Sequence, residues 1–315
     1  MTRVFFVADL HGSAVCFRKF INAARIYKAD VLLVGGDVAA KTMTPVFPEG
    51  TGWIVTSEGE TRRASSAEEL AKLEASLRDS ATLPLRTTPT EWDERLADQA
   101  KADRAFEALA LDDLRRWLAW AKERLTGVPT RLLIGLGNDE LTPMERVIAN
   151  DDRVELTNLE ILRFDPDHEM LTIPYSNPTP WKTHRELSEE ELARRIDELA
   201  ARLEDPARAV FNIHVPPFGT PLDLAPRLQP DLTKTMSPGG ETEIVHVGST
   251  AVREALERHH PLLSLHGHIH ESRGTTPFGR TLSLNCGSAY TEGTLLGALV
   301  DLERDRVRSA VLSSG

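Results

Sequence analysis

Seven side chains suited to divalent cations are spread over five separate segments of the sequence. They are Asp9, His11, Asp37, Asn138, His214, His268 and His270. Each segment lies at or just past a short apolar run of the kind that forms a buried strand. Carboxylate, amide and imidazole groups are the ligands that hard to borderline divalent metals prefer. The ordered set therefore predicts a site that holds two such metals at the ends of several strands.

The strands that position these side chains are short and rich in Val, Leu and aromatic residues. The chain begins with strands at residues 3–8 and 31–34, joined by a helix over residues 13–27, and these form a β-α-β unit. Capping residues predict two further helices, over residues 188–203 and 249–258. More strands are expected at residues 131–136, 209–213, 262–265, 281–285, 294–302 and 307–312.

Residues 41–128 interrupt this pattern after the second strand, where a compact connection would need far fewer residues. We therefore predict one domain over residues 1–315 that carries a mainly helical insertion. Ser66 and Thr90 precede acidic residues and offer N-caps for two helical stretches, the second of which contains no Pro or Gly. The helices could pack beside the core or cap the metal site, because both ends of the insertion adjoin predicted metal-binding segments.

The charge of the chain argues against some classes of partner. The net charge is −11 and the isoelectric point is about 5.5, which disfavours non-specific binding to nucleic acid or to anionic lipid. Cys16 and Cys286 are too few for a disulfide scaffold, and we expect both to be reduced and buried. No signal peptide or membrane-spanning stretch fits the sequence, so we expect a cytoplasmic protein without a membrane partner. The oligomeric state does not follow from the sequence.

The metal-binding segments also resemble a known family. In chain order they read Asp9-Leu10-His11, Gly36-Asp37, Gly137-Asn138-Asp139-Glu140, His214 and Gly267-His268-Ile269-His270. This order resembles the calcineurin-like metallophosphoesterase superfamily, whose pattern is D-x-H, G-D, G-N-H-[D/E], H and G-H-x-H. It is similar to a prokaryotic branch in which the third motif lacks its His. The resemblance implies an α/β fold, an α+β sandwich of two packed mixed β-sheets flanked by helices.

The resemblance implies a role for each residue of the set. One metal would take Asp9, His11, Asp37 and His270 as ligands. The other would take Asp37, Asn138, His214 and His268. Asp37 would bridge the two, and a metal-bound hydroxide would attack the phosphorus of a small-molecule phosphate ester. Because the set contains no thiolate, it indicates Mn, Fe, Zn or a similar pair of divalent ions. His266 either supports a ligand or is a structural residue of its strand.

Asp139 is the departure from the family pattern, which has His beside the ligand Asn. Two nearby cations should lower the pKa of Asp139, leaving it an anion that repels dianionic monoesters and donates protons poorly. We therefore expect activity on phosphodiesters or on esters with good leaving groups. In the alternative, Asp139 only forms a hydrogen bond with a neighbouring residue. The proton donor is then His246, from the long loop over residues 215–248. Glu140 supports either the Asn138 loop or a ligand histidine.

Two other functions are compatible with the same motifs. A nuclease of this superfamily would share the site, but the sequence offers no evident basic track for a phosphate backbone. A non-catalytic scaffold could retain the fold after losing its metals. Every expected ligand position holds a competent side chain, which favours the enzyme over the scaffold.

Overall fold

Two six-stranded mixed sheets form the centre of the computed structural model, which describes residues 1–57, 59–237 and 239–315. The first sheet has the order β18-β17-β1-β2-β7-β8. Its strands are β1 (Thr2–Val7), β2 (Val31–Val34), β7 (Arg131–Gly135), β8 (Val154–Thr157), β17 (Leu296–Glu303) and β18 (Arg306–Ser314). Strands β1, β2, β7 and β8 run parallel to one another. Strand β17 pairs antiparallel with β1, and β18 pairs antiparallel with β17.

The second sheet has the order β15-β16-β14-β11-β10-β9. Its strands are β9 (Ile161–Arg163), β10 (Glu169–Ile173), β11 (Val210–Ile213), β14 (Leu263–His266), β15 (Gly274–Phe278) and β16 (Thr281–Asn285). The four inner strands are parallel and the two outer ones antiparallel. The α/β architecture of two mixed sheets expected from the sequence is thus confirmed.

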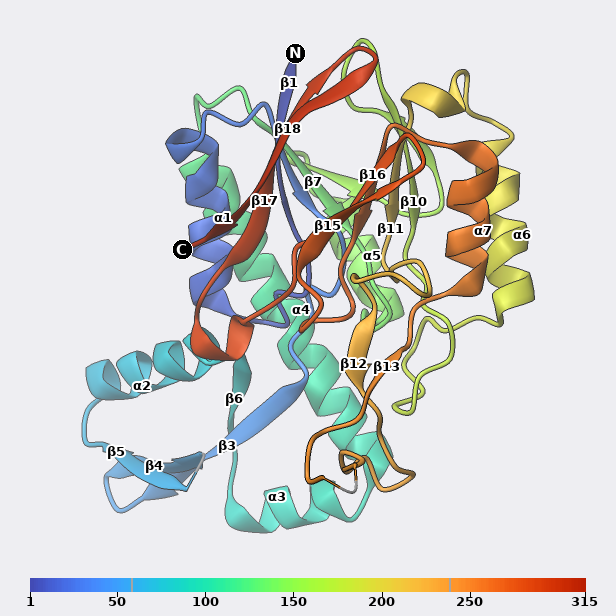
Figure 1. The fold of residues 1–315 in the computed structure, drawn as a ribbon. Coiled ribbons are helices and arrows are strands. Elements are labelled where there is room, and N and C mark those ends of the chain that lie inside the picture. The colour runs from blue at the N-terminus through green and yellow to red at the C-terminus, as the bar shows by residue number, and fades with distance from the viewer. Residues whose placement is uncertain (58, 238) are drawn as a thin grey trace.

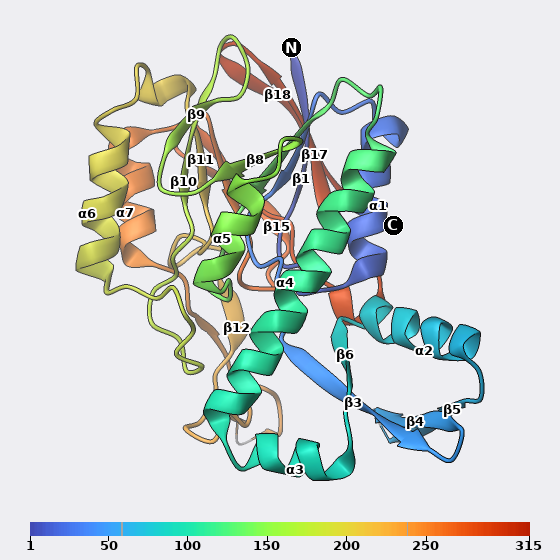
Figure 2. The same ribbon diagram turned by 180° about the vertical axis from the view of Figure 1, so that it is seen from behind.

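Side-chain alternation along the strands builds separate cores on the two faces of each sheet. In β1, Phe6 joins the cluster between the sheets, whereas Phe5 and Val7 join the cluster under the helices. Helices α1 (Ala14–Ile26), α4 (Gln99–Arg124) and α5 (Thr142–Ala149) cover the first sheet, and α6 (Glu189–Ala200) and α7 (Thr250–His259) cover the second (Figures 1 and 2). The result is four layers, with helices outside and sheets inside.

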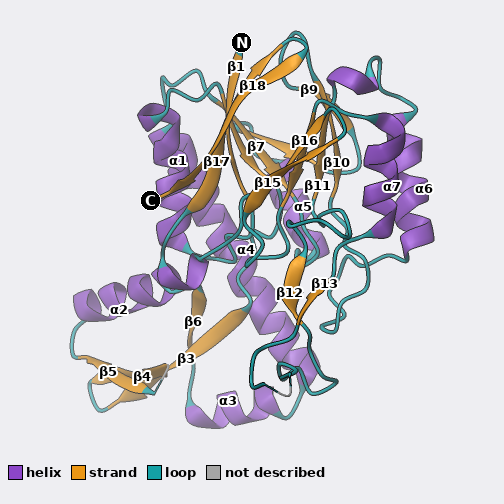
Figure 3. Ribbon diagram, in the orientation of Figure 1, coloured by secondary structure: helices purple, strands orange, loops and turns teal. Residues whose placement is uncertain are grey.

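The insertion contains a sheet that the sequence analysis missed. Four strands in the order β5-β4-β3-β6 accompany its helices (Figure 3). They are β3 (Thr42–Glu49), β4 (Gly52–Ser57), β5 (Glu60–Ala64) and β6 (Thr82–Arg86), with α2 (Ala67–Asp79) and α3 (Pro89–Leu96) beside them. A small core of its own includes Val46, Val55 and Leu70. The strands are difficult to predict because Thr, Pro and Glu break their apolar pattern.

Helix starts were predicted correctly at some positions and incorrectly at others. Ser66, Ser188 and Ser249 are the N-caps of α2, α6 and α7. The start expected at Thr90 is wrong: Thr88 caps α3 in a reciprocal capping box, and Pro89 takes the first helical position. The second helical stretch is also broken, because the Asp98 side chain accepts a hydrogen bond from the Lys101 N–H and begins α4 there.

The long loop after His214 contains a short hairpin made of β12 (Leu224–Pro226) and β13 (Ile244–His246). The hairpin and the small sheet of the insertion lie beyond the carboxyl ends of the parallel strands, whereas α4 runs back along the first sheet (Figures 1 and 2). Both cysteines are buried and free, as expected. Among the residues that the structure describes, no helix has both the length and the apolarity needed to cross a bilayer.

Candidate metal centre

Parallel strands of both sheets deliver the predicted metal ligands to one end of the molecule. Asp9, Asp37 and Asn138 follow β1, β2 and β7 of the first sheet, while His214 and His268 follow β11 and β14 of the second. The carboxyl ends of parallel strands are where such sheets bind ligands. Asp9, Asp37 and His268 have positive φ angles of 56°, 54° and 66°, respectively. This left-handed backbone is unfavourable for non-glycine residues and is found where function constrains a loop.

Asp37 and Asp9 form the centre of the cluster, with His214 beside them. The Nε2 atom of His214 lies 3.3 Å from Asp37 Oδ2 and 3.8 Å from Asp9 Oδ1. All three residues are buried. Asp9 is fixed by the His268 backbone N–H, which lies 3.0 Å from both carboxylate oxygens. Two buried carboxylates at such close range require a positive charge between them.

His11 and His270 also approach Asp9. Their Nε2 atoms are 3.1 Å apart, and His270 Nε2 lies 3.5 Å from Asp9 Oδ1. His11 Nε2 is also 3.6 Å from Asp37 Oδ2. Two ring nitrogens and two carboxylate oxygens that face one point form a set of electron pairs that a cation can accept.

Asn138 and His268 complete the second group of ligands. The Asn138 Oδ1 atom lies 2.7 Å from His268 Nδ1. The Nδ2 atom of Asn138 donates to Asp139 Oδ1 and to Thr183 Oγ1, both at 2.9 Å, so its oxygen is turned toward His268. These contacts fix the orientation of the Asn138 amide, and a metal ligand needs such a fixed orientation.

The donor set fits divalent metals on two structural grounds. Asp9, His11 and His270 can offer converging atoms to one ion, and Asp9, Asp37 and His214 can do so for another. In addition, the buried His11 Nδ1 and His214 Nε2 atoms have no hydrogen-bond partner among the described residues. An unpaired buried nitrogen is costly unless a ligand binds it. The seven predicted ligand side chains are therefore brought together, and the cluster can hold metal ions.

The pKa values of the histidines follow their surroundings. Burial lowers the pKa of His11 to about 3 and that of His268 to about 4, so both rings are neutral and able to act as ligands. Burial also disfavours protonated His214, but Asp37 and Asp9 outweigh it and raise the pKa of His214 to about 9. A cation bound beside these carboxylates would replace this effect and leave the His214 ring neutral, as a metal ligand must be.

Glu140 holds two of the site loops together, which confirms that it supports the Asn138 loop. Its carboxylate accepts backbone N–H groups of Asp37 at 3.1 Å, Val38 at 2.5 Å and Ala39 at 3.0 Å, together with that of Gly137. Burial and repulsion by Asp37 raise the pKa of this carboxyl to about 7, against the effect of the hydrogen bonds.

Asp139 lies at the rim of the cluster. Its Oδ2 atom is 3.1 Å from Lys41 Nζ and 3.7 Å from His11 Nδ1. Burial and the charge of Asp37 raise the pKa of Asp139, and Lys41 lowers it. The depression expected from neighbouring cations concerns the metal-loaded site and stays a prediction. Tyr290 packs nearby, with its ring centroid 4.8 Å from that of His11.

His266 is buried behind the candidate ligands, whereas His246 lies on the partly exposed hairpin. His266 is fully buried, with Nδ1 2.8 Å from the Ile213 carbonyl and Nε2 2.7 Å from Ser264 Oγ, so it braces the strands behind the ligands. His246 lies on β13, with a side chain that is 41% exposed and Nδ1 2.7 Å from Asp223 Oδ1. Its role as a proton donor stays a prediction.

Three residues near the site were missed by the sequence analysis. Lys41 pairs with Asp139, Thr183 binds the Asn138 amide, and Arg185 donates its backbone N–H to the Asn138 carbonyl at 3.1 Å. Lys41 lies four residues after Asp37, a proximity that could have identified it. Nothing in the sequence around Thr183 and Arg185 indicates that their loop returns to the cluster.

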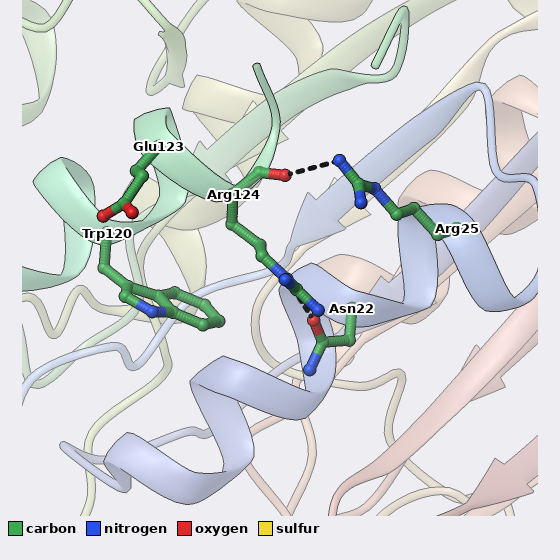
Figure 4. Close-up of a pocket in the computed structure, with 5 residues that line it drawn as sticks. All are labelled: Asn22, Arg25, Trp120, Glu123 and Arg124. Carbon is green, nitrogen blue, oxygen red and sulfur yellow. Dashed lines mark hydrogen bonds between the residues drawn. The ribbon is translucent and has the colours of Figure 1, made fainter. Parts of the chain in front are cut away.

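A surface pocket of about 230 Å³ lies between α1 and α4. It is lined by Asn22, Arg25, Trp120, Glu123 and Arg124 (Figure 4). Neither the predicted metal ligands nor Asp139 line it, so it is separate from the candidate metal centre.

No protein-family model matches the chain, and a search of curated proteins gives no match. Solved structures do share its fold. A crystal structure of TT1561 of Thermus thermophilus aligns with a TM-score of 0.55 and 12% identity, covering 100% of this chain and 98% of that one. An archaeal phosphodiesterase aligns over 99% of this chain and all of its own at 9% identity, but its TM-score of 0.37 supports no argument. The alignment with TT1561 shows a shared fold over the length of both chains.

Proposed function

We propose that this protein is a metal-dependent phosphoesterase with a binuclear centre. The supporting observation is the buried cluster in which two carboxylates and three imidazoles converge while two ring nitrogens lack partners among the described residues. Two divalent cations of the Mn, Fe or Zn type, when bound there, would offset phosphate charge and activate water for attack on phosphorus.

Each side chain has a defined task in this proposal. Asp9, His11 and His270 would hold one ion, and Asn138, His214 and His268 would hold the other. Asp37 would contribute to both. Glu140 fixes the backbone on both sides of Asp37, and Thr183 turns the Asn138 oxygen toward the ion. Ligands held by such supporting contacts lose little entropy on binding.

We propose phosphodiesters, or esters with good leaving groups, as the substrates. Asp139 Oδ2 is engaged by Lys41 at 3.1 Å, and a carboxylate held in an ion pair is a poor proton donor. An enzyme without a strong acid at this position favours leaving groups that depart as anions. An anionic Asp139 also repels a dianionic monoester more than a monoanionic diester, so turnover of bis-p-nitrophenyl phosphate should exceed that of p-nitrophenyl phosphate, although both release p-nitrophenol. A clear preference for the monoester would contradict this substrate choice.

His246 is the second candidate for proton donor, since its imidazole is half-exposed on the hairpin. If it donates the proton, His246→Asn should lower kcat for diphenyl phosphate by about 10²-fold or more, because phenol is a poor leaving group. Turnover of bis-p-nitrophenyl phosphate should fall much less. Equal losses for both esters would exclude His246 from proton transfer.

Asp37→Asn tests the central claim. Because both ions depend on this carboxylate, we expect loss of bound metal, measured by elemental analysis, and loss of diester hydrolysis with added Mn²⁺. Asp30→Asn is the matched control, since Asp30 lies at the opposite end of β2 and accepts the Arg3 N–H at 2.7 Å. Wild-type metal content and activity in Asp37→Asn would refute the proposal.

A further inference from the structure

The loop between β10 and α6, residues 174–188, is built around one half-buried carboxylate. The Glu186 carboxylate accepts four hydrogen bonds, from the N–H and the hydroxyl of both Thr179 and Thr183. The base of the loop is closed by Ser176, whose N–H donates to the Arg185 carbonyl at 3.1 Å. Such an internally bonded loop presents the residues at its tip in a fixed position.

The same loop is attached to the candidate metal centre at several points. Arg185 donates its backbone N–H to the Asn138 carbonyl at 3.1 Å and its Nε to the Glu140 carbonyl at 3.3 Å. Thr183 accepts the Asn138 amide at 2.9 Å. On its other side, Asn177 donates to the Val247 carbonyl at 3.3 Å. The loop therefore belongs to the wall of the site.

Trp181 lies at the tip of this loop, with 60% of its surface exposed. The other four tryptophans of the chain are buried or half-buried. Trp181 is two residues from Thr183, so their Cα atoms are no more than about 7 Å apart. Lys182 follows in the left-handed conformation, with φ of 52°, and is also exposed. Trp181 is thus an exposed aromatic surface on a loop that is hydrogen-bonded to Asn138 and Glu140.

We propose that Trp181 stacks on a planar heterocyclic group of the substrate, so that the substrates are nucleotide-sized phosphodiesters that carry a base. This inference rests on the proposed phosphodiesterase function. Bases stack on exposed indoles irrespective of sequence, and the adjacent Lys182 ammonium can face a phosphate or sugar oxygen. The acidic chain offers no extended basic track, which limits the substrate to a small nucleotide ester.

Two esters with one leaving group test the stacking. Thymidine 5′-(p-nitrophenyl phosphate) and methyl p-nitrophenyl phosphate carry the same charge and release the same phenol, but only the first has a base. Trp181→Ala should raise the KM of the thymidine ester about tenfold relative to that of the methyl ester. This change corresponds to about 1.4 kcal/mol of binding free energy. Trp181→Phe should restore most of the ratio. Trp120→Phe, in the pocket between α1 and α4, should leave both KM values unchanged. An unchanged ratio in Trp181→Ala would overturn the proposal.

A binding measurement separates this inference from the proposed function. Thymidine 5′-monophosphate should quench the tryptophan fluorescence of the wild type and of Trp120→Phe, and the quench should vanish in Trp181→Phe. If the wild type hydrolyses neither ester but shows this quench, the phosphodiesterase proposal fails and base stacking stands. If the wild type hydrolyses both esters but the quench persists in Trp181→Phe, the stacking proposal fails alone.

Discussion

Replacing Thr183 by Val should weaken one metal site while leaving the other intact. The hydroxyl of Thr183 accepts one of the two hydrogen bonds that orient the Asn138 amide, and Asp139 accepts the other. Val has nearly the same shape but cannot accept a hydrogen bond. Without this bond, the Asn138 oxygen is less strictly turned toward His268, where the ion would bind.

The size of the effect follows from the bonds that remain. A neutral hydrogen bond contributes about 0.5 to 1.5 kcal/mol, and one to a charged group such as Asp139 contributes about 1.5 to 3 kcal/mol. The weaker bond is lost and the stronger one remains. We therefore expect the affinity for the second ion to fall about tenfold, which is the lower end of the range for residues that support metal ligands.

Thr179→Val is the matched control for this experiment. Thr179 and Thr183 both donate their hydroxyls to Glu186 Oε1, at 2.5 Å and 2.8 Å, but only Thr183 binds Asn138. The two variants should lose similar free energy of unfolding in urea, whereas only Thr183→Val should lose affinity in a calorimetric Mn²⁺ titration. Equal metal affinities in the two variants would refute the role given to Thr183.

Two further predictions concern stability. Glu140→Ala leaves four backbone N–H groups without an acceptor, which costs about 1 to 3 kcal/mol each and is partly offset by removal of a buried charge. Unfolding in urea should show that the free energy of unfolding falls by about 3 kcal/mol. Wild-type stability of the variant would contradict this. Asp165 is partly buried, which opposes ionisation, but hydrogen bonds led by that of His168 lower its pKa from 3.8 to about 2. Ionised Asp165 therefore stabilises the folded protein by about 2 kcal/mol above pH 4, and this contribution is lost as the pH falls toward 2. Asp165→Asn should remove that part of the pH dependence of unfolding.

The sequence predicted the strands that precede the candidate metal ligands because their signals are local. Strands β2 and β16 have the predicted bounds: β2 is a short apolar run, and β16 alternates polar with apolar residues before a turn. Strands β8, β9 and β10 were missed, since they are short or interrupted by polar residues. Their places are fixed by pairing with distant strands, and single-sequence patterns do not encode such pairing.

The same distinction holds for the candidate site. The candidate ligand side chains are adjacent to strand ends, so their convergence could be predicted from their motifs, and their role as ligands stays a prediction. Lys41, Thr183 and Trp181 lie in loops whose return to the cluster depends on tertiary contacts. Their residue types are common on protein surfaces, and only the folded chain shows which of them lie near Asn138.

The pairing of β1 with β17 has a consequence for biosynthesis. Phe5 lies opposite Leu299 in the central sheet, and Asp9 lies beside His268 and His270. During translation the first strand therefore waits for a neighbour that is made much later, and contacts so distant in sequence form slowly. The proposed ligand set is complete only once His268 and His270 have left the ribosome, so we expect metal to be loaded after Asp9 and Asp37 have long been exposed.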